Sequence, residues 1–93
     1  YYVGLATMEI REIIKDILEC FEFSGPDCTV GVIQGYLNGK RNASYKYKEV
    51  YRLMNYYCSN CRPLFHKESR GEHIYFWLLY DKSDYLLYYN LRG

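Results

Sequence analysis

Residues 40–57 read KRNASYKYKEVYRLMNYY, and this stretch decides the fold. On a helix with 3.6 residues per turn, its apolar residues recur at i, i+3, i+4 and i+7 and form one stripe. The members of this stripe are Val50, Leu53, Met54 and Tyr57. With the stripe turned toward a core, the opposite face carries Tyr45, Lys48, Arg52, Asn55 and Ser59. These residue types contact phosphates and bases, so we expect a helix over about 44–59 whose outer face suits a nucleic acid.

The residues ahead of this helix are also polar and basic. They are Lys40, Arg41, Asn42 and Ser44. A helix N-terminus offers unpaired N–H groups and partial positive charge, and Ser44 adds a hydroxyl donor for a phosphate. We expect Lys48 and Arg52 to neutralise phosphates, and Arg52 or Asn55 to read a base edge. The alternative is a solvated helix face that serves only protein contacts.

The charge of the chain is divided between its two parts. Residues 1–39 carry six acidic and two basic side chains, a net charge of −4, whereas residues 40–93 carry ten basic and five acidic ones, a net charge of +5. A basic part with an acidic back suits a polyanion docking on one face. The alternative is ordinary surface charge.

Length and composition favour one folded domain over residues 1–93. The chain has 93 residues, of which 49% are hydrophobic, enough for a single small core and too many for a disordered chain. No apolar run approaches the length of a membrane span, and no signal peptide is visible, so we expect an intracellular protein, in cytoplasm or nucleus, with no membrane contact. Methionine occurs only at positions 8 and 54, which also fits a fragment of a larger protein.

Two further helices are expected before the basic one. Residues 8–22 repeat apolar side chains at helical spacing, and Ser24-Gly25-Pro26-Asp27 ends that helix. Thr7 is its expected cap. A second helix is predicted over 29–37, with a stop at Asn38-Gly39, although Gly31 and Gly35 weaken a helix interior by about 1 kcal/mol each.

The sequence period changes after residue 60. Residues 62–67 and 73–80, separated by a polar turn at 68–72, are typical of a β-hairpin. Its expected core-facing residues are Ile74, Phe76 and Leu78, and those on its other side are Tyr75, Trp77 and Leu79. Lys67 and Arg70 are expected near the tip, where Glu68 and Glu72 offset their charge.

The two ends of the chain carry weaker signals. A helical turn or two is expected over 85–91, and residues 1–6 read as a short strand or a disordered end.

Three helices followed by a hairpin, with the third helix basic, are the order of a winged helix. The fold class expected is therefore α+β. In that architecture the second and third helices form a helix-turn-helix unit, and the hairpin is the wing that lies against the backbone or a groove.

Four cysteines raise the question of a metal. Cys58-x2-Cys61 has the spacing of half a zinc site, but Cys20-x7-Cys28 is too wide for the usual second half. Cys20 falls near the core side of its helix, where a free thiol is ordinary. We therefore predict no metal and no cofactor, with a zinc site or a disulfide as the alternatives.

Catalytic patterns are weak in this sequence. Its two histidines, His66 and His73, both fall on the expected hairpin, and we recognise no nucleophile motif, phosphate loop or inward carboxylate pair. The prediction is a chain without enzymatic activity and without catalytic residues.

Two segments resemble the RecQ C-terminal winged-helix domain. The run over 13–20, a break containing glycine, and V-G-V-I-Q-G-Y-L-N-G-K-R-N over 30–42 are similar to its opening helices. Residues 74–87 are similar to its last strand, polar turn and short helix. The resemblance implies binding to duplex DNA, sometimes with strand separation by an aromatic or apolar hairpin tip. Here the tip over 68–71 is Glu-Ser-Arg-Gly and lacks such a residue.

Together these features predict a DNA-binding winged helix, either a transcription regulator or the DNA-binding module of a RecQ-like helicase. The expected partner is DNA, in duplex form, together with a second copy of the chain or a larger protein. The alternative function is a protein-interaction or dimerisation module that uses the aromatic end from Trp77 to Leu91. The residues expected at the nucleic-acid site are Lys40, Arg41, Ser44, Tyr45, Lys48, Arg52, Asn55, Lys67 and Arg70.

Overall fold

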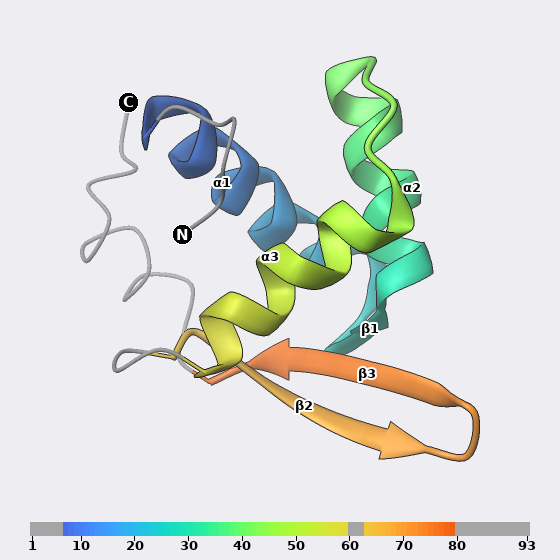
Figure 1. Cartoon of the computed structure of the whole chain (residues 1–93). Coiled ribbons are helices and arrows are strands. Elements are labelled where there is room, and N and C mark those ends of the chain that lie inside the picture. The colour runs from blue at the N-terminus through green and yellow to red at the C-terminus, as the bar shows by residue number, and fades with distance from the viewer. Residues whose placement is uncertain (1–6, 60–62, 80–93) are drawn as a thin grey trace.

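Helix α1 spans Thr7–Ser24 in the computed structural model, which describes residues 7–59 and 63–79 (Figure 1). Its apolar stripe lies in the core, so the helix predicted over 8–22 is confirmed. The buried members are Ile13, Ile14, Ile17, Leu18, Cys20 and Phe21. Gly25 takes a φ of +104°, a conformation that favours glycine, and Pro26 follows it. These two residues turn the chain away from the helix.

Strand β1, Asp27–Thr29, was not predicted from the sequence. It pairs antiparallel with a distant segment, and Cys28 lies opposite Phe76. Three residues are too short to display an alternating pattern, and the pairing partner is far along the chain. The predicted break at Ser24–Asp27 therefore includes the first residue of a strand, Asp27.

Helix α2 spans Val30–Arg41 and is longer than the predicted 29–37. Thr29 caps it, because its hydroxyl accepts the Val32 N–H at 3.3 Å. The predicted stop at Asn38-Gly39 is wrong. The helix passes through both residues and ends at Asn42, which adopts the left-handed conformation at φ 50° and donates its N–H to the Asn38 carbonyl.

Helix α3 spans Tyr47–Ser59, so it begins three residues later than predicted. Its first backbone bond runs from the Val50 N–H to the Lys46 carbonyl at 3.1 Å. The Glu49 carboxylate reaches back to accept the Lys46 N–H at 2.8 Å. The predicted apolar stripe is confirmed, since all four of its residues are buried, with Met54 fully enclosed.

The predicted hairpin is formed by β2, Phe65–Arg70, and β3, His73–Leu78. Its turn is Gly71-Glu72, with Gly71 at φ +64°, and is shorter than the predicted 68–72. The first strand occupies 65–70 in place of the predicted 62–67, and the second begins at 73 as predicted but ends at 78 in place of 80. The strands form an antiparallel sheet in the order β1-β3-β2. Phe76 is fully buried, as predicted for the core-facing set, whereas Ile74 and Leu78 are only partly buried.

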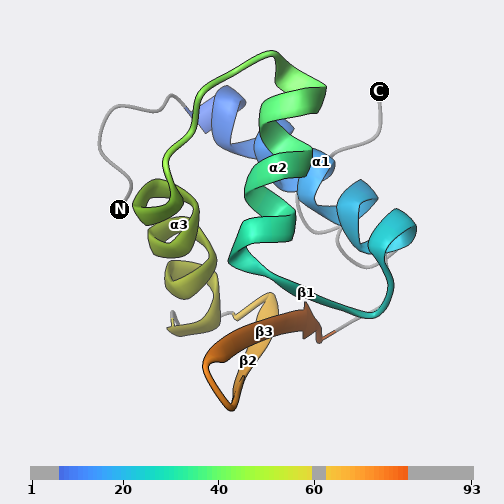
Figure 2. The same ribbon diagram turned by 90° about the vertical axis from the view of Figure 1, so that its right-hand side faces the viewer.

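The described residues form an α+β fold of three helices and a three-stranded antiparallel sheet. Figure 2 shows the helices on one side of the sheet, and α1 and α3 contribute to the core together with Phe65 and Phe76. The order α1-β1-α2-α3-β2-β3 is consistent with the predicted winged-helix topology. No helix in the described ranges is long and apolar enough to cross a membrane. The elements expected over 1–6 and 85–91 lie outside the described residues.

Candidate nucleic-acid interface

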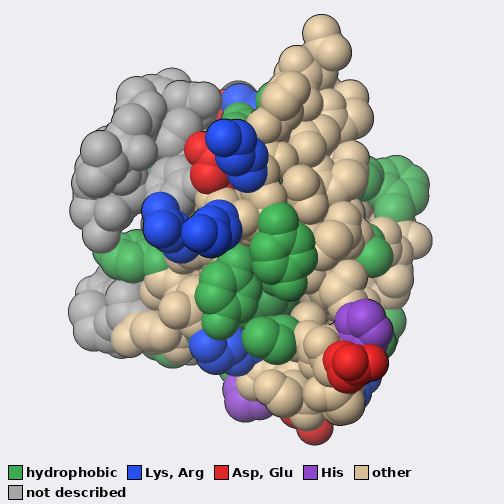
Figure 3. Space-filling view, turned by 45° about the vertical axis from the view of Figure 1, so that its right-hand side comes forward, with side chains coloured by type: hydrophobic (Ala, Val, Ile, Leu, Met, Phe, Trp, Pro, Cys, Tyr) green, Lys and Arg blue, Asp and Glu red, His purple; other side chains and the backbone are tan. Residues whose placement is uncertain are grey.

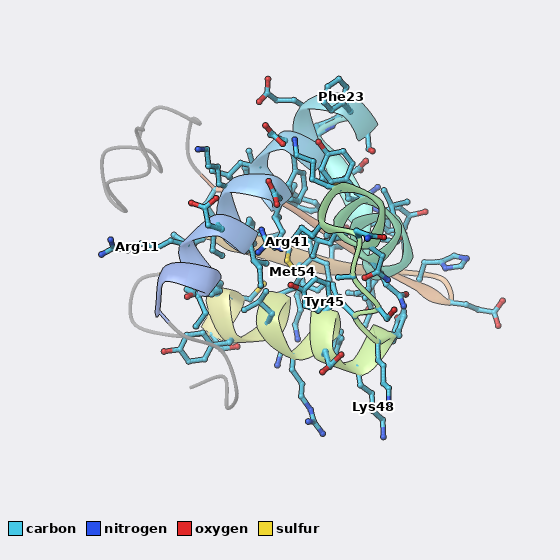
Figure 4. The ribbon with its side chains drawn as sticks, turned by 90° about the horizontal axis from the view of Figure 1, so that it is seen from above. Arg11, Phe23, Arg41, Tyr45, Lys48 and Met54 are labelled. Atoms are coloured by element: carbon cyan, nitrogen blue, oxygen red, sulfur yellow. The ribbon has the colours of Figure 1, made fainter. Side chains whose placement is uncertain are left out.

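The outward face of α3 carries two exposed basic side chains, Lys48 and Arg52. They lie one helical turn apart and opposite the buried stripe of the same helix. Figure 4 shows Lys48 extending away from the body of the molecule. Among the residues that the structure describes, neither side chain has a hydrogen-bond or ion-pair partner. Both charges are therefore available to an external anion.

Lys67 extends this surface from the helix onto the hairpin. Its ammonium group on β2 donates a hydrogen bond to the Asn55 side-chain oxygen on α3. The same nitrogen lies 5.8 Å from the centroid of the Tyr51 ring, within cation–π range. The contact leaves the Asn55 amide N–H groups as the donors for any further ligand. We call Lys48, Arg52, Asn55 and Lys67 the α3 basic face.

Two neighbours of this face were not among the predicted site residues. Lys46 directly precedes α3 and is exposed, and the Tyr51 ring lies beside Lys67. The K-Y-K pattern over 46–48 is the sequence signal that could have identified Lys46. Figure 3 shows basic side chains next to hydrophobic ones on this side of the molecule. A surface of this kind suits a ligand that is both anionic and partly apolar.

Arg41 has a different environment from the α3 basic face. Its guanidinium donates to Asp16 of α1 at 3.0 Å and to the Tyr45 hydroxyl at 3.2 Å. Burial lowers the pKa of Arg41, but its hydrogen bonds with Asp16 and Tyr45 outweigh burial and leave that pKa raised. Asp16 is only 8% exposed, so the arginine neutralises an otherwise buried carboxylate. Arg41 thus joins α2 to α1, and its location in Figure 4 is between the helices.

Lys40 is also paired with α1. Its ammonium group lies 2.7 Å from a Glu19 oxygen, which accepts the Tyr36 hydroxyl as well at 3.3 Å. The hydrogen bond to Glu19 raises the pKa of Lys40. Lys40 and Arg41 form the last turn of α2, and do not lead directly into α3 as the sequence predicted.

The segment between α2 and α3 is fixed through Tyr45. The Tyr45 N–H donates to the Asn38 side-chain oxygen at 2.7 Å, and the Tyr45 carbonyl accepts from Asn38 at 3.0 Å and from Gln34 at 3.1 Å. Tyr45 is therefore not on the outward face of α3. Ser44 is exposed beside it, but three residues before the helix, so its hydroxyl is not at the helix N-terminus.

Arg70 lies on the other face of the sheet from Lys67, because residues an odd number apart on a strand point to opposite sides. It makes ion pairs with Asp27 at 2.7 Å and Glu68 at 3.3 Å. Its guanidinium also covers the Tyr75 and Trp77 rings, at 4.8 and 5.4 Å from their centroids. The structure therefore separates the two basic residues that the sequence had placed together at the hairpin tip.

The histidines and cysteines are the remaining candidate groups for chemistry. His66 packs on Trp77 with ring centroids 4.7 Å apart, and His73 lies edge-on to Tyr75 at 6.4 Å. The described ranges contain no group of three or more His, Cys, Asp or Glu residues that could hold a metal ion. Cys61 of the Cys58-x2-Cys61 pattern lies outside the described residues.

No protein-family model matches this chain, and no curated protein or solved structure matches it either.

Proposed function

We propose that this chain is a winged-helix domain that binds duplex DNA, with α3 as its recognition helix and the β2–β3 hairpin as its wing. The observation that carries the proposal is the α3 basic face, where Lys48 and Arg52 have no partner among the described residues and Lys67 continues the charge onto the hairpin. Positive charges without partners are suited to phosphates, and binding there releases counterions from the DNA.

The location of α3 supports groove entry. One side of the helix is held in the core through four buried residues, and the other side is exposed along its length. The helix has 13 residues and is therefore about 20 Å long, and the major groove of B-DNA, about 12 Å wide, admits one helix. A helix held so firmly loses little conformational freedom on binding.

Individual residues then take separate tasks. Lys48, Arg52 and Lys67 neutralise phosphates, with Lys46 as a further contact. Asn55 uses its amide N–H groups as donors to a base edge, because Lys67 already donates to its oxygen. Exposed Ser44 is a phosphate donor in the preceding loop. Lys40, Arg41, Tyr45 and Arg70 hold the scaffold through the contacts described above.

The proposed class is a DNA-binding module without enzymatic activity, either a small transcription regulator or the winged helix of a RecQ-like helicase. The turn at Gly71-Glu72 carries no aromatic side chain, so we do not propose strand separation by this hairpin. Duplex binding requires only the α3 basic face.

The test is fluorescence anisotropy of a labelled duplex, and of its single strand, at several salt concentrations. We expect duplex binding with log K falling linearly with log salt, and a slope of about −3.6, the value for four neutralised phosphates. The matching single strand should bind more weakly. If the duplex does not bind at about 20–50 mM salt, the proposal is overturned.

Exposed apolar side chains favour protein interaction as a second function. Phe23 at the end of α1 is 79% exposed, and Leu79 after β3 is 41% exposed. Leu79 belongs to the aromatic Trp77–Leu91 end, most of which lies outside the described residues. Static light scattering, together with the DNA titration, separates the two functions. If the chain forms a dimer, Leu79→Ser abolishes that dimer, and the chain does not bind DNA, the interaction module is favoured.

A further inference from the structure

The side chain of Asn55 on α3 is held in one orientation by Lys67 of β2. The Lys67 ammonium group donates a hydrogen bond to the Asn55 side-chain oxygen. An ammonium group has donors and no acceptor, so the contact requires the amide oxygen, and not the amide nitrogen, to face Lys67. Within residues 7–59 and 63–79 this amide makes no other hydrogen bond. Its NH2 group is therefore the end that a ligand meets.

Lys67 is itself fixed by a second contact with α3. Its ammonium nitrogen lies 5.8 Å from the centroid of the Tyr51 ring, one helical turn before Asn55. Tyr51 is partly buried and packs against the hydrophobic core, so the lysine rests on a side chain that the fold already positions. The orientation of the Asn55 amide is thus set before a ligand arrives, and binding does not have to order it.

We propose that this arrangement makes the interface selective for guanine over adenine at the base that Asn55 contacts, with Lys67 as the positioning residue. The inference rests on the proposed function, because it names the base that the α3 basic face reads in duplex DNA. It goes further in predicting a sequence preference and the residue that controls it.

The hydrogen-bonding groups of the bases explain the preference. In the major groove adenine presents one acceptor, N7, and one donor, the N6 amino group, and an asparagine with a free amide pairs with both. The Asn55 oxygen keeps a second lone pair, but an amino group that approached it would lie beside the positive charge of Lys67. Guanine presents two acceptors, N7 and O6, which suit a site made only of donors. Thymine offers one acceptor, O4, and cytosine offers a donor, so both fit less well.

The charge of Lys67 and its hold on Asn55 are separable effects. Loss of the charge alone weakens binding to every sequence alike, because phosphates carry no sequence information. Loss of the hydrogen bond frees the amide to turn and to pair with adenine. Lys67→Met removes both the charge and the hydrogen bond. Lys67→Arg keeps a cation that can only donate, and Lys48→Ala removes an equal charge from a side chain that is not bound to Asn55.

The experiment is selection of bound duplexes from a library with a randomised segment, using the full chain and sequencing the bound fraction. The position read by Asn55 is the one whose preference disappears in Asn55→Ala. At that position we expect the parent protein to favour guanine over adenine by about 5- to 150-fold. Lys67→Met should favour adenine there instead. Lys67→Arg and Lys48→Ala should keep guanine, and Lys48→Ala should weaken binding to all sequences.

The failure of this inference is distinguishable from the failure of the proposed function. If the parent protein binds no duplex, both are overturned. Duplex binding without any position that depends on Asn55 overturns the inference alone. It is also overturned if the parent already favours adenine at the position of Asn55, or if Lys67→Met keeps the preference for guanine. Anisotropy titrations of single duplexes with guanine or adenine at that position measure the same ratio independently.

Discussion

Among the described residues between 40 and 67, two groups of basic side chains differ in their partners. At the α1–α2 contact, Arg41 pairs with Asp16 and Lys40 with Glu19. On the α3 basic face, Lys48 and Arg52 have no partner among the described residues, and Lys67 is bound to the neutral Asn55. The charges of the first group are neutralised by acidic side chains of the protein itself.

This difference shows that net charge alone does not locate a polyanion site. The excess of basic side chains from residue 40 onward makes this part of the sequence basic. In the fold, however, acidic residues of α1 form ion pairs with two of these bases. Paired charges contribute to the cohesion of the helices, whereas charges without partners remain available for a ligand.

The largest expected effect is the loss of the Asp16–Arg41 pair. Arg41→Met leaves a carboxylate that is 8% exposed without its cation, so we expect a loss of about 2–4 kcal/mol in the free energy of unfolding, measured by urea denaturation. The Asp16→Asn/Arg41→Met double variant should lose less than Arg41→Met alone. DNA affinity of the folded fraction should stay within about twofold. A stable Arg41→Met protein that binds DNA poorly would instead place Arg41 at the interface.

The second prediction removes charge from the α3 basic face. Lys48→Ala together with Arg52→Ala should weaken duplex binding by about 10- to 100-fold at low salt, because two phosphate contacts are lost. Both side chains are exposed, so the free energy of unfolding should change by less than about 1 kcal/mol.

The matched control for that variant lies on α1. Arg11→Ala with Lys15→Ala removes the same amount of charge from a helix outside the proposed interface. Figure 4 shows Arg11 pointing away from the molecule. Equal losses of affinity in the two double variants would mean that net charge, and not the α3 basic face, determines binding.

The third prediction compares two basic residues on opposite faces of β2. Lys67→Met should reduce the magnitude of the salt slope by about 0.9, the value for one phosphate contact. Arg70→Met should leave the slope unchanged and lower the melting temperature slightly, because Arg70 is paired with Asp27 and stacked on Tyr75 and Trp77. Both variants are measured by the same anisotropy titration. If Arg70→Met changed the salt slope more than Lys67→Met, the wing would contact DNA through the sheet face that carries Arg70 and not through the face that carries Lys67.

Local patterns predicted the helices well and their boundaries less well. The apolar stripes of α1 and α3 identify buried faces because burial imposes the helical period directly on the sequence. The end of α2 was predicted four residues early, because Asn38-Gly39 has the composition of a stop. Asn38 instead uses its side chain to fix Tyr45, a contact between non-neighbouring residues that no local pattern contains.

The candidate site was predicted in part for the same reason. The helical period placed Lys48, Arg52 and Asn55 on one exposed or partly exposed face, because exposure follows from the opposite buried stripe. Whether a base has a partner depends on which helix lies beside it. The acids that engage Lys40 and Arg41 come from α1, and Asp27 of β1 engages Arg70 in addition to Glu68 of its own strand. The sequence does not specify the contacts with α1 and β1 locally.

The smallest effect concerns alkaline pH and the buried side of α3. Burial raises the pKa of Tyr57, and the neighbouring Tyr56 adds to the shift. The folded state therefore favours the neutral phenol. Its contribution to stability is fully present below the unfolded pKa of about 10 and is lost as the pH rises through the higher folded value. The part of the free energy of unfolding that Tyr57 contributes should be constant below about pH 9 and decline above about pH 10.

Tyr57→Phe isolates this contribution from that of the thiols. Burial also raises the pKa of Cys58, so part of the alkaline decline belongs to cysteine and should persist in the variant. Between about pH 9 and 11, one unit on either side of the tyrosine pKa, the free energy of unfolding should fall less in Tyr57→Phe than in the parent protein. Urea denaturation at each pH measures this difference. An identical decline in the two proteins would show that Tyr57 ionises as readily in the fold as in the unfolded chain. The buried stripe would then be more open to water than its packing around Met54 indicates.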